Sequence, residues 1–228
     1  MNNTFFKFIK VFRKREGLTQ KQVAGKIGIS RPSYIALEQG KRELNLSEAE
    51  KLVDIFGISI EDFFSGNIQD INKYKQMIFA FLRNSFANGE KIPKTKLAKF
   101  LYLADFGWYY DHFESMSGMR YRKMQYGPVP DAYFQVVDEL YEDGKLNIEM
   151  TKEGAMLISQ TKSGEREEVN LLNNAEKKLI QDISKKWKDK RTSEIVDFTH
   201  NQLPYKLCSD REIIPYALIT QEDPKYVY

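Results

Sequence analysis

The chain has 228 residues, of which 42% are hydrophobic and 13% aromatic, and its formal net charge at pH 7 is +3. This composition is typical of a folded, soluble protein and not of a disordered one. No apolar run approaches the roughly 18 residues that a membrane span needs, and the charged N-terminus does not fit a secretory signal. These features exclude a membrane protein, and we expect a cytoplasmic one.

Residues that bind metals or form disulfides are scarce in the sequence. The single cysteine, Cys208, excludes an internal disulfide and a cysteine-rich zinc site, and it fits a reducing compartment. The two histidines, His112 and His200, leave little material for a metal centre. We therefore expect neither a metal nor a cofactor.

The charges are distributed unevenly along the chain. Residues 1–47 contain ten lysines and arginines against three acidic residues, whereas residues 67–228 contain 24 of each kind. A basic excess beside a neutral remainder is typical of a nucleic-acid-binding end joined to a different second part, although a solvated lysine-rich surface gives the same charge. The polar segment SGNIQDINK, residues 65–73, marks a joint, and we predict domains over residues 1–66 and 67–228.

Short helices separated by glycine turns are predicted in the first domain. In FFKFIKVFRKREG the apolar residues recur at helical spacing, and Gly17 is placed to stop that helix. Thr19 and Gln22 have the spacing of a capping box at the start of a second helix. Gly28 then permits the positive φ of a tight turn.

Three further helices are predicted behind that turn. Ser30 caps the first of them, Pro32 falls in its first turn, and Gly40 ends it. Ser47 is predicted to cap the next helix, with Glu50 completing a second capping box. A last segment, IEDFFSG, supplies two phenylalanines that we expect to pack on the others.

The stretch LTQKQVAGKIGISRPSYIALEQGKREL resembles the Cro/C1-type, or XRE-type, helix-turn-helix family, and the resemblance extends over residues 5–65. The matching residues are Gln20, Ala24, Gly28, Ser30, Tyr34, Ile35, Glu38, Gly40 and Arg42. The resemblance implies a bundle of four or five helices that binds double-stranded operator DNA. Because one such module buries too little surface for tight binding, we expect a homodimer on a two-fold operator.

The second helix of such a motif enters the major groove with its N-terminal residues on base edges. Here Arg31 can donate two hydrogen bonds to guanine, Ser33 can hydrogen-bond to either base type, and Pro32 can contact a thymine methyl group. Gln20 matches the position that grips the backbone and braces the first base contact. Tyr34, Lys41 and Arg42 are predicted phosphate contacts. The full predicted DNA-binding set is Gln20, Lys21, Arg31, Pro32, Ser33, Tyr34, Lys41 and Arg42.

The second domain is predicted to be mostly helical. Helices are expected over about 69–88, behind a cap at Thr95, and behind a cap at Asp131 with Gly144 as its end. NGEKIPKTK reads as a turn and GMRYRKMQYG as a short extended piece. KLNIEM and AMLISQT predict a small β-hairpin. Two more helices are expected in NAEKKLIQDISKKWKDK and TSEIVDFTHNQ, and the tail from residue 211 is expected to be irregular. The fold class is therefore mainly α.

KTKLAKFLYLADFGWYY, followed by YRKMQYGPVPDAYFQVVDEL and GKL, resembles the Panacea, or SocA-like, antitoxin domain over roughly residues 75–200. The matching residues are Lys96, Leu97, Lys99, Leu101, Tyr102, Asp105, Tyr126, Gly127, Pro128 and Val129. This sequence departs from the family in the lead-in RKMQYGPVP, which lacks an expected tryptophan, and in a longer aromatic stretch, FGWYYDHF. The resemblance implies a domain that binds a toxin protein.

The turn YGPVP allows two interpretations. Gly127 permits close backbone approach, and two prolines fix φ on either side of Val129, so the loop is stiff. Such a loop can simply set the angle between two elements. It can also form a rigid edge that docks another protein, because tyrosine and arginine are enriched at interfaces, although the tyrosines can equally be core residues. The predicted partner-binding residues are Arg120, Tyr121, Arg122, Tyr126, Gly127, Pro128, Val129 and Pro130.

Together the two resemblances imply an antitoxin that neutralises a toxin and represses its own operon. A stand-alone or phage-type repressor, whose larger domain dimerises or senses a ligand, is the alternative. Within the family, a proteolytic adaptor is not separated from plain sequestration by the sequence.

An enzyme is the third hypothesis. Asp105 with His112, and Asp197 with His200, have helical spacing and can be drawn as acid–base pairs. No nucleophile elbow, phosphate loop or metal-ligand spacing accompanies them. We therefore do not expect an enzyme.

Overall fold

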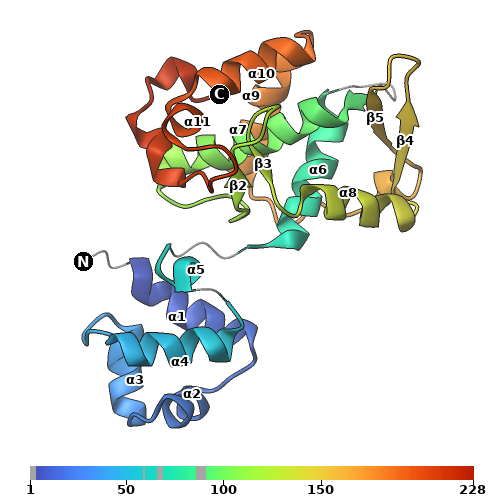
Figure 1. The fold of residues 1–228 in the computed structure, drawn as a ribbon. Coiled ribbons are helices and arrows are strands. Elements are labelled where there is room, and N and C mark those ends of the chain that lie inside the picture. The colour runs from blue at the N-terminus through green and yellow to red at the C-terminus, as the bar shows by residue number, and fades with distance from the viewer. Residues whose placement is uncertain (1–3, 59, 66–68, 86–90) are drawn as a thin grey trace. The chain divides into compact units, whose positions relative to one another are not determined.

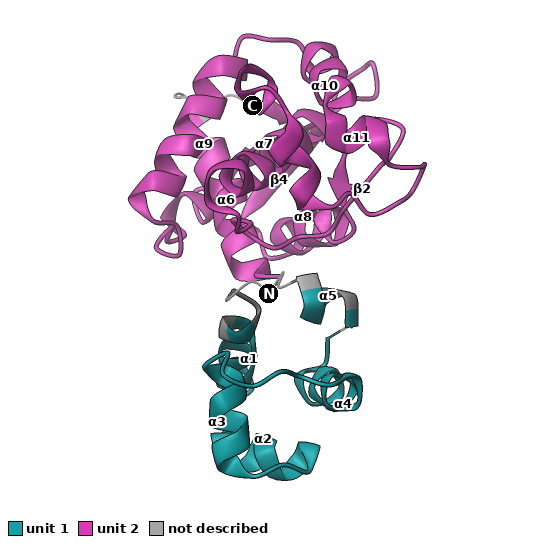
Figure 2. Ribbon diagram, turned by 90° about the vertical axis from the view of Figure 1, so that its left-hand side faces the viewer, with its two compact units in different colours: residues 1–68 teal, residues 69–228 magenta. Residues whose placement is uncertain are grey.

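The computed structural model describes residues 4–58, 60–65, 69–85 and 91–228. The fold is mainly α, as the sequence predicts, with small antiparallel strand pairs (Figure 1). The chain forms two compact units, Met1–Ile68 and Gln69–Tyr228 (Figure 2). The middle of the predicted joint, residues 66–68, lies outside the described residues.

Unit 1 contains five helices that share one apolar core. α1 packs against α3 and α5, while α2 packs against α3 and α4. All five helices contribute buried side chains, and Phe12 of the first stacks on Phe56 of the fourth with ring centroids 5.5 Å apart. The helices are α1 (Thr4–Arg15), α2 (Gln20–Ile27), α3 (Arg31–Glu38), α4 (Leu46–Phe56) and α5 (Ile60–Ser65).

The helix caps and the glycine turn predicted around α2 and α3 are confirmed. Thr19 and Gln22 form both hydrogen bonds of a capping box at the start of α2. Gly28 ends that helix in the left-handed region, with φ of 81°. Ser30 caps α3 by accepting a hydrogen bond from the Ser33 backbone N–H. These local signals fix the helix-turn-helix without help from distant residues.

The predicted cap of α4 is wrong by two residues. Asn45, not Ser47, is the N-cap, and its side chain accepts a 2.8 Å hydrogen bond from the Glu48 backbone N–H. The Glu48 carboxylate returns a bond to the Asn45 backbone N–H, so Glu48 and not Glu50 completes the box. Asparagine caps a helix as well as serine does, and both patterns are present in the sequence. Of the two phenylalanines of α5, Phe63 is buried and Phe64 is exposed.

Unit 2 is built around α7 (Lys94–His112), in which residues 96–107 are all buried. α6, α9 and α10 lie beside it, and the first of the C-terminal 3-10 helices also packs on it (Figure 1). A helix covered on every side shows no amphipathic pattern of its own. The other helices of unit 2 are α6 (Ile71–Ser85), α8 (Tyr133–Glu142), α9 (Asn174–Trp187), α10 (Thr192–Asn201) and α11 (Leu203–Leu207).

Two of the predicted helix caps in unit 2 are wrong. α7 follows Pro93 directly, so Thr95 lies inside its first turn and makes no cap. α8 has Ala132 at its N-cap position with no side-chain hydrogen bond. The Asp131 carboxylate, predicted as that cap, instead accepts a 2.6 Å hydrogen bond from Arg122 Nε. The local sequence pattern predicted that Asp131 caps the helix, but the ion pair with Arg122 occupies its carboxylate instead.

A three-stranded antiparallel sheet has the order β1–β5–β4. The predicted hairpin is confirmed as β4 (Leu146–Met150) and β5 (Met156–Gln160). β1 (Ile92–Pro93) was predicted as part of a turn, but it pairs with Leu157 and Ile158. The rest of that predicted turn up to residue 90, and the predicted end of α6 at residues 86–88, lie outside the described residues.

A second pair of strands surrounds the YGPVP turn. β2 (Tyr121–Arg122) is antiparallel to β3 (Val129–Pro130), which confirms the predicted extended piece. The C-terminal tail passes beside it, because Arg122 forms a β-bridge with Ile213. The predicted irregular tail contains the 3-10 helices η2 (Tyr216–Gln221) and η3 (Pro224–Tyr226), while η1 (Gly164–Arg166) follows β5.

Candidate functional site

The first turn of α3 presents two of the predicted base-reading residues to solvent. Arg31 and Pro32 are exposed, and Ser33 is half-buried. The Ser33 hydroxyl lies 2.9 Å from the Ser30 hydroxyl, and this contact belongs to the cap of the helix. Arg31 therefore has the freest side chain at the end of the helix that would meet base edges.

The start of α2 lies next to this turn. A shallow concavity of about 440 Å³ is lined by Leu18, Thr19, Gln20, Lys21, Arg13 and Arg31. The first backbone N–H groups of a helix attract anions. Here Lys21 and Arg31 lie beside them, whereas the charge of Arg13 is compensated by Glu38. The arrangement suits a DNA phosphate placed between α2 and α3.

Gln20 belongs to a polar network that joins α1, α2 and α3. Its Nε2 donates a 3.0 Å hydrogen bond to Glu38 Oε2, and Arg13 Nε donates a 2.6 Å bond to Glu38 Oε1. Burial pushes the pKa of Glu38 upward, but the hydrogen bonds from Arg13 and Gln20 outweigh burial and hold that pKa below its ordinary value. The network fixes the angle between the two helices of the motif. Sequence reasoning missed Arg13, which stands 25 positions away from its partner.

Two of the predicted phosphate contacts make structural contacts within unit 1. Tyr34 is 0% exposed in the core of unit 1, where it cannot reach DNA, and its burial raises its pKa. Arg42 donates to both carboxylate oxygens of Glu48, at 3.0 and 2.6 Å. The hydrogen bond from Arg42 lowers the pKa of Glu48 and stabilises the cap of α4. Lys41, beside them, remains exposed.

The YGPVP turn is held from beneath by α7 and α10. Gly127 is buried with φ of 92°, and a Cβ added there would lie 2.8 Å from Lys99 Cε and 3.0 Å from Thr199 Oγ1. Lys99, fully buried, donates a 2.8 Å hydrogen bond from Nζ to the Pro128 carbonyl. Burial lowers the pKa of Lys99 to about 7. Lys99 and the YGPVP turn, both part of the family motif, are therefore packed against each other.

Asp105, a second charged residue of the motif, is also fully buried in α7. Its carboxylate accepts hydrogen bonds from the Ser117 backbone N–H at 2.6 Å, the Ser117 hydroxyl at 2.5 Å and the Tyr121 hydroxyl at 2.7 Å. Burial raises the pKa of Asp105 to about 6, against these bonds. Tyr121, predicted to bind a partner, is therefore a core residue.

Most of the other predicted partner-binding residues also point inward. Pro128 and Pro130 are buried, and Arg120 and Val129 are half-buried. Arg122 is committed to Asp131 and to the Arg211 carbonyl. Only Tyr126, 66% exposed, presents a large side chain to solvent at the turn. This arrangement favours the first interpretation of the turn, as a device that sets the angle between elements.

The two acid–base pairs that the sequence spacing allows are not hydrogen-bonded couples among the described residues. Asp105 is occupied by Ser117 and Tyr121, whereas His112 lies on Trp108 with its Nδ1 3.0 Å from the Trp108 carbonyl. His200 stacks on Tyr205, and Asp197 is exposed. Over the same described ranges, no cluster of three or more His, Cys, Asp or Glu side chains could hold a metal, and no helix is long and apolar enough to cross a membrane.

The helix-turn-helix family model matches residues 9–63, and the model for the antitoxin SocA-like, Panacea domain matches residues 97–205. The first unit thus defines the class of the protein, a helix-turn-helix transcriptional regulator. The chain belongs to that family, and it carries a SocA-like Panacea domain on the C-terminal side of the helix-turn-helix unit. Both assignments agree with the resemblances found in the sequence.

Several transcriptional regulators match about a quarter of the chain. An HTH-type transcriptional regulator, MJ0272, of Methanocaldococcus jannaschii is 43% identical over 56 residues, which are 25% of this chain and 85% of that protein. A regulator of Archaeoglobus fulgidus is 39% identical over 25% of this chain and 80% of its own length. YqaE of Bacillus subtilis is 36% identical over 27% of this chain and 53% of its own length. No solved structure matches the chain.

Proposed function

We propose that this protein is the antitoxin of a toxin–antitoxin pair, which binds and neutralises a cognate toxin protein and represses its own operon as a homodimer on operator DNA. The observation that carries the proposal is the union, in one chain, of a helix-turn-helix unit and a SocA-like Panacea unit. The exposed Arg31 and the cationic concavity beside it support sequence-specific DNA binding by the first unit.

A two-part experiment tests the proposal. The protein encoded by the neighbouring open reading frame is expressed alone and together with this full-length chain, and growth is measured. We expect the neighbour alone to stop growth, and co-expression to restore growth and yield a stable complex. A harmless neighbour that does not co-purify would contradict neutralisation and would favour a repressor whose second unit dimerises or senses a ligand.

Repression is tested with a reporter placed behind the operon's own promoter. We expect the wild-type chain to lower reporter output and the Arg31→Ala variant to lose this effect, because that side chain is placed to read bases. The same variant should still rescue growth from the toxin. Equal loss of repression and rescue would show that the two activities are not divided between the units as proposed.

A further inference from the structure

The outer face of α8 exposes two large aromatic side chains. Phe134 is 52% exposed and Tyr141 51% exposed. They stand seven positions apart, with Asp138 between them, so all three lie on one side of the helix. The opposite side of α8 is buried through Val136, Val137 and Leu140. The helix thus has one face in the core and a second, partly apolar face in solvent.

The same region carries a local negative charge. Residues 131–143 contain five acidic residues and no basic one, although unit 2 as a whole is neutral. Three of the five have cationic partners: Asp131 pairs with Arg122, Asp138 with Lys94 at 3.6 Å, and Glu139 with Lys75 at 2.9 Å. The two that have no ion-pair partner within the described part of the chain are Glu142 and Asp143.

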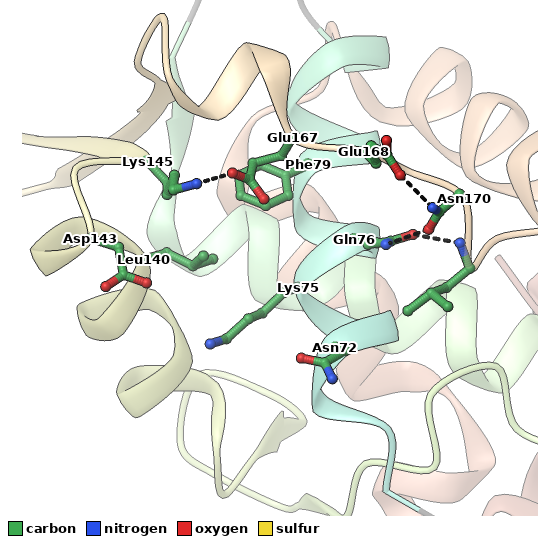
Figure 3. Close-up of a pocket in the computed structure, with 11 residues that line it drawn as sticks. Asn72, Lys75, Gln76, Phe79, Leu140, Asp143, Lys145, Glu167, Glu168 and Asn170 are labelled. Atoms are coloured by element: carbon green, nitrogen blue, oxygen red, sulfur yellow. Dashed lines mark hydrogen bonds and ion pairs between the residues drawn. The ribbon is translucent and has the colours of Figure 1, made fainter.

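A groove of about 420 Å³ lies along the other edge of the exposed half of α8, between α6, α8 and the segment at residues 167–171 (Figure 3). Phe79 and Leu140 supply apolar lining, and Leu171 is partly exposed at its wall. The carboxylates of Asp143 and Glu168 stand on opposite sides of the groove (Figure 3). Two lysines also line it, and each has an acidic partner: Lys145 pairs with Glu167 and Lys75 with Glu139.

We infer that the outer face of α8 and this groove form the surface that docks a basic segment of the neutralised protein, and the inference rests on the proposed function. A lysine or arginine of the partner would place its cation beside the carboxylate of Asp143, at the edge of the groove. Apolar side chains of the partner would pack on Phe134 and Tyr141, which have the exposure and chemistry of interface anchors.

The charge of this surface selects among possible occupants. DNA is excluded because its phosphates would meet the acidic residues of α8. A second copy of the chain in a two-fold contact would oppose the same acidic residues to each other. A basic protein segment is the occupant whose charge is complementary.

The test measures binding of the full-length chain to the purified product of the neighbouring open reading frame. The first variant carries Phe134→Ala and Tyr141→Ala, and we expect its affinity to fall at least about thirty-fold. Tyr126→Ala is the comparison variant, because that tyrosine is at least as exposed, at 66%, but lies at the YGPVP turn, the competing surface predicted from the sequence. It should bind within about two-fold of wild type.

The second variant, Asp143→Lys, reverses one charge at the groove. A lysine is favourable at the C-terminal end of α8, so the helix itself is not weakened. We expect the association rate to fall about ten-fold and its dependence on salt to diminish. Glu153→Lys makes the same charge change at an exposed position that does not line the groove, and it should bind like wild type. Unchanged operator affinity and thermal unfolding verify that each variant is folded.

The outcomes separate the inference from the function on which it rests. Wild-type binding that is lost only in the α8 and groove variants supports both. Wild-type binding that survives in those variants, or that is lost with Tyr126→Ala instead, overturns the docking surface and leaves the antitoxin function standing. A wild-type chain that neither binds the neighbour nor restores growth overturns both.

Discussion

The two units differ in where their charged residues lie. In unit 1 the residues expected to meet base edges, such as Arg31, are exposed at the start of a helix, while the motif residues Tyr34 and Glu38 hold the helices together. In unit 2 the charged motif residues Lys99 and Asp105 are 0% exposed. A DNA reader must expose its chemistry, because its ligand approaches from outside. The motif of unit 2 instead secures α7 to the segments around it, so it identifies a fold more directly than a binding surface.

This difference has an energetic side. A buried charge is costly unless hydrogen bonds compensate for its lost hydration. Asp105 receives three such bonds, whereas Lys99 has one described hydrogen bond, to the Pro128 carbonyl. Changes at Lys99 or Asp105 should therefore act on stability, and changes at the exposed start of α3 on DNA affinity.

The largest effect is expected from Gly127→Ala. The new methyl group would contact Lys99 Cε at 2.8 Å, in a backbone region with φ of 92° that L-residues rarely adopt. Because Lys99 is fully buried, it has little room to move, and we expect unit 2 to lose roughly 2–4 kcal/mol of stability. Both tryptophans, Trp108 and Trp187, lie in unit 2, so their fluorescence during urea unfolding reports on this unit. Unchanged unfolding would mean that the turn is not locked as described.

The next effect concerns pH. The pKa of Lys99 is lowered from 10.5 to about 7 in the folded chain. Between pH 7 and 9 the unfolded chain therefore holds a proton that the folded chain has lost, and stability rises with pH by up to about 1.4 kcal/mol per pH unit. Lys99→Met should lack this contribution. Urea unfolding measures the free energy of unfolding of wild type and Lys99→Met at several pH values between 7 and 9. The same pH dependence in both proteins would contradict a deprotonated Lys99.

A smaller effect is expected on DNA affinity when exposed residues of unit 1 are changed. Arg31→Ala should weaken binding to the true operator by about 1–3 kcal/mol and binding to random DNA very little. Lys41→Ala is the control, because a phosphate contact should weaken both to the same extent and reduce the salt slope by about one. Fluorescence anisotropy on the two DNA sequences separates these cases. Equal losses for Arg31→Ala would move that residue into the phosphate class.

The smallest effect concerns the cap of α4. Asn45→Ala should destabilise this helix by about 1 kcal/mol, since the side chain accepts from the Glu48 backbone N–H. Ser47→Ala, at the cap position that the sequence pattern first indicates, should change little. Hydrogen exchange of the α4 amides measures both variants. The reverse ranking would restore Ser47 as the cap.

Most helices of the fold follow from the sequence, because periodicity and caps are local signals. The errors occur where two local signals compete or where a distant residue decides. Asn45 and Ser47 both have a glutamate three positions on, and only the folded bundle selects the first. Asp131 stands near the start of α8, where it could cap the helix, but its carboxylate binds Arg122 instead. β1 is only two residues long and exists because β5 lies beside it.

The candidate sites show the same limit. The exposure of Arg31 and Pro32 agrees with the base-reading role inferred from their helix position. Tyr34 and Tyr121 were assigned to contacts because tyrosine serves both cores and interfaces, and burial decides between these roles. The groove beside α8 combines residues from α6, α8 and the segment at 167–171, and no local pattern connects them.

The tail that crosses unit 2 has a consequence for synthesis. Tyr216 and Ile219 complete the core around α7, so unit 2 cannot close until they have been translated, whereas unit 1 needs only the residues up to 65. About 150 residues separate the two events, or roughly 8–30 s at ordinary elongation rates of 5–20 residues per second. The nascent chain thus folds its helix-turn-helix unit well before unit 2. Under the proposed antitoxin function, we expect a prematurely terminated chain to occupy the operator without neutralising the toxin.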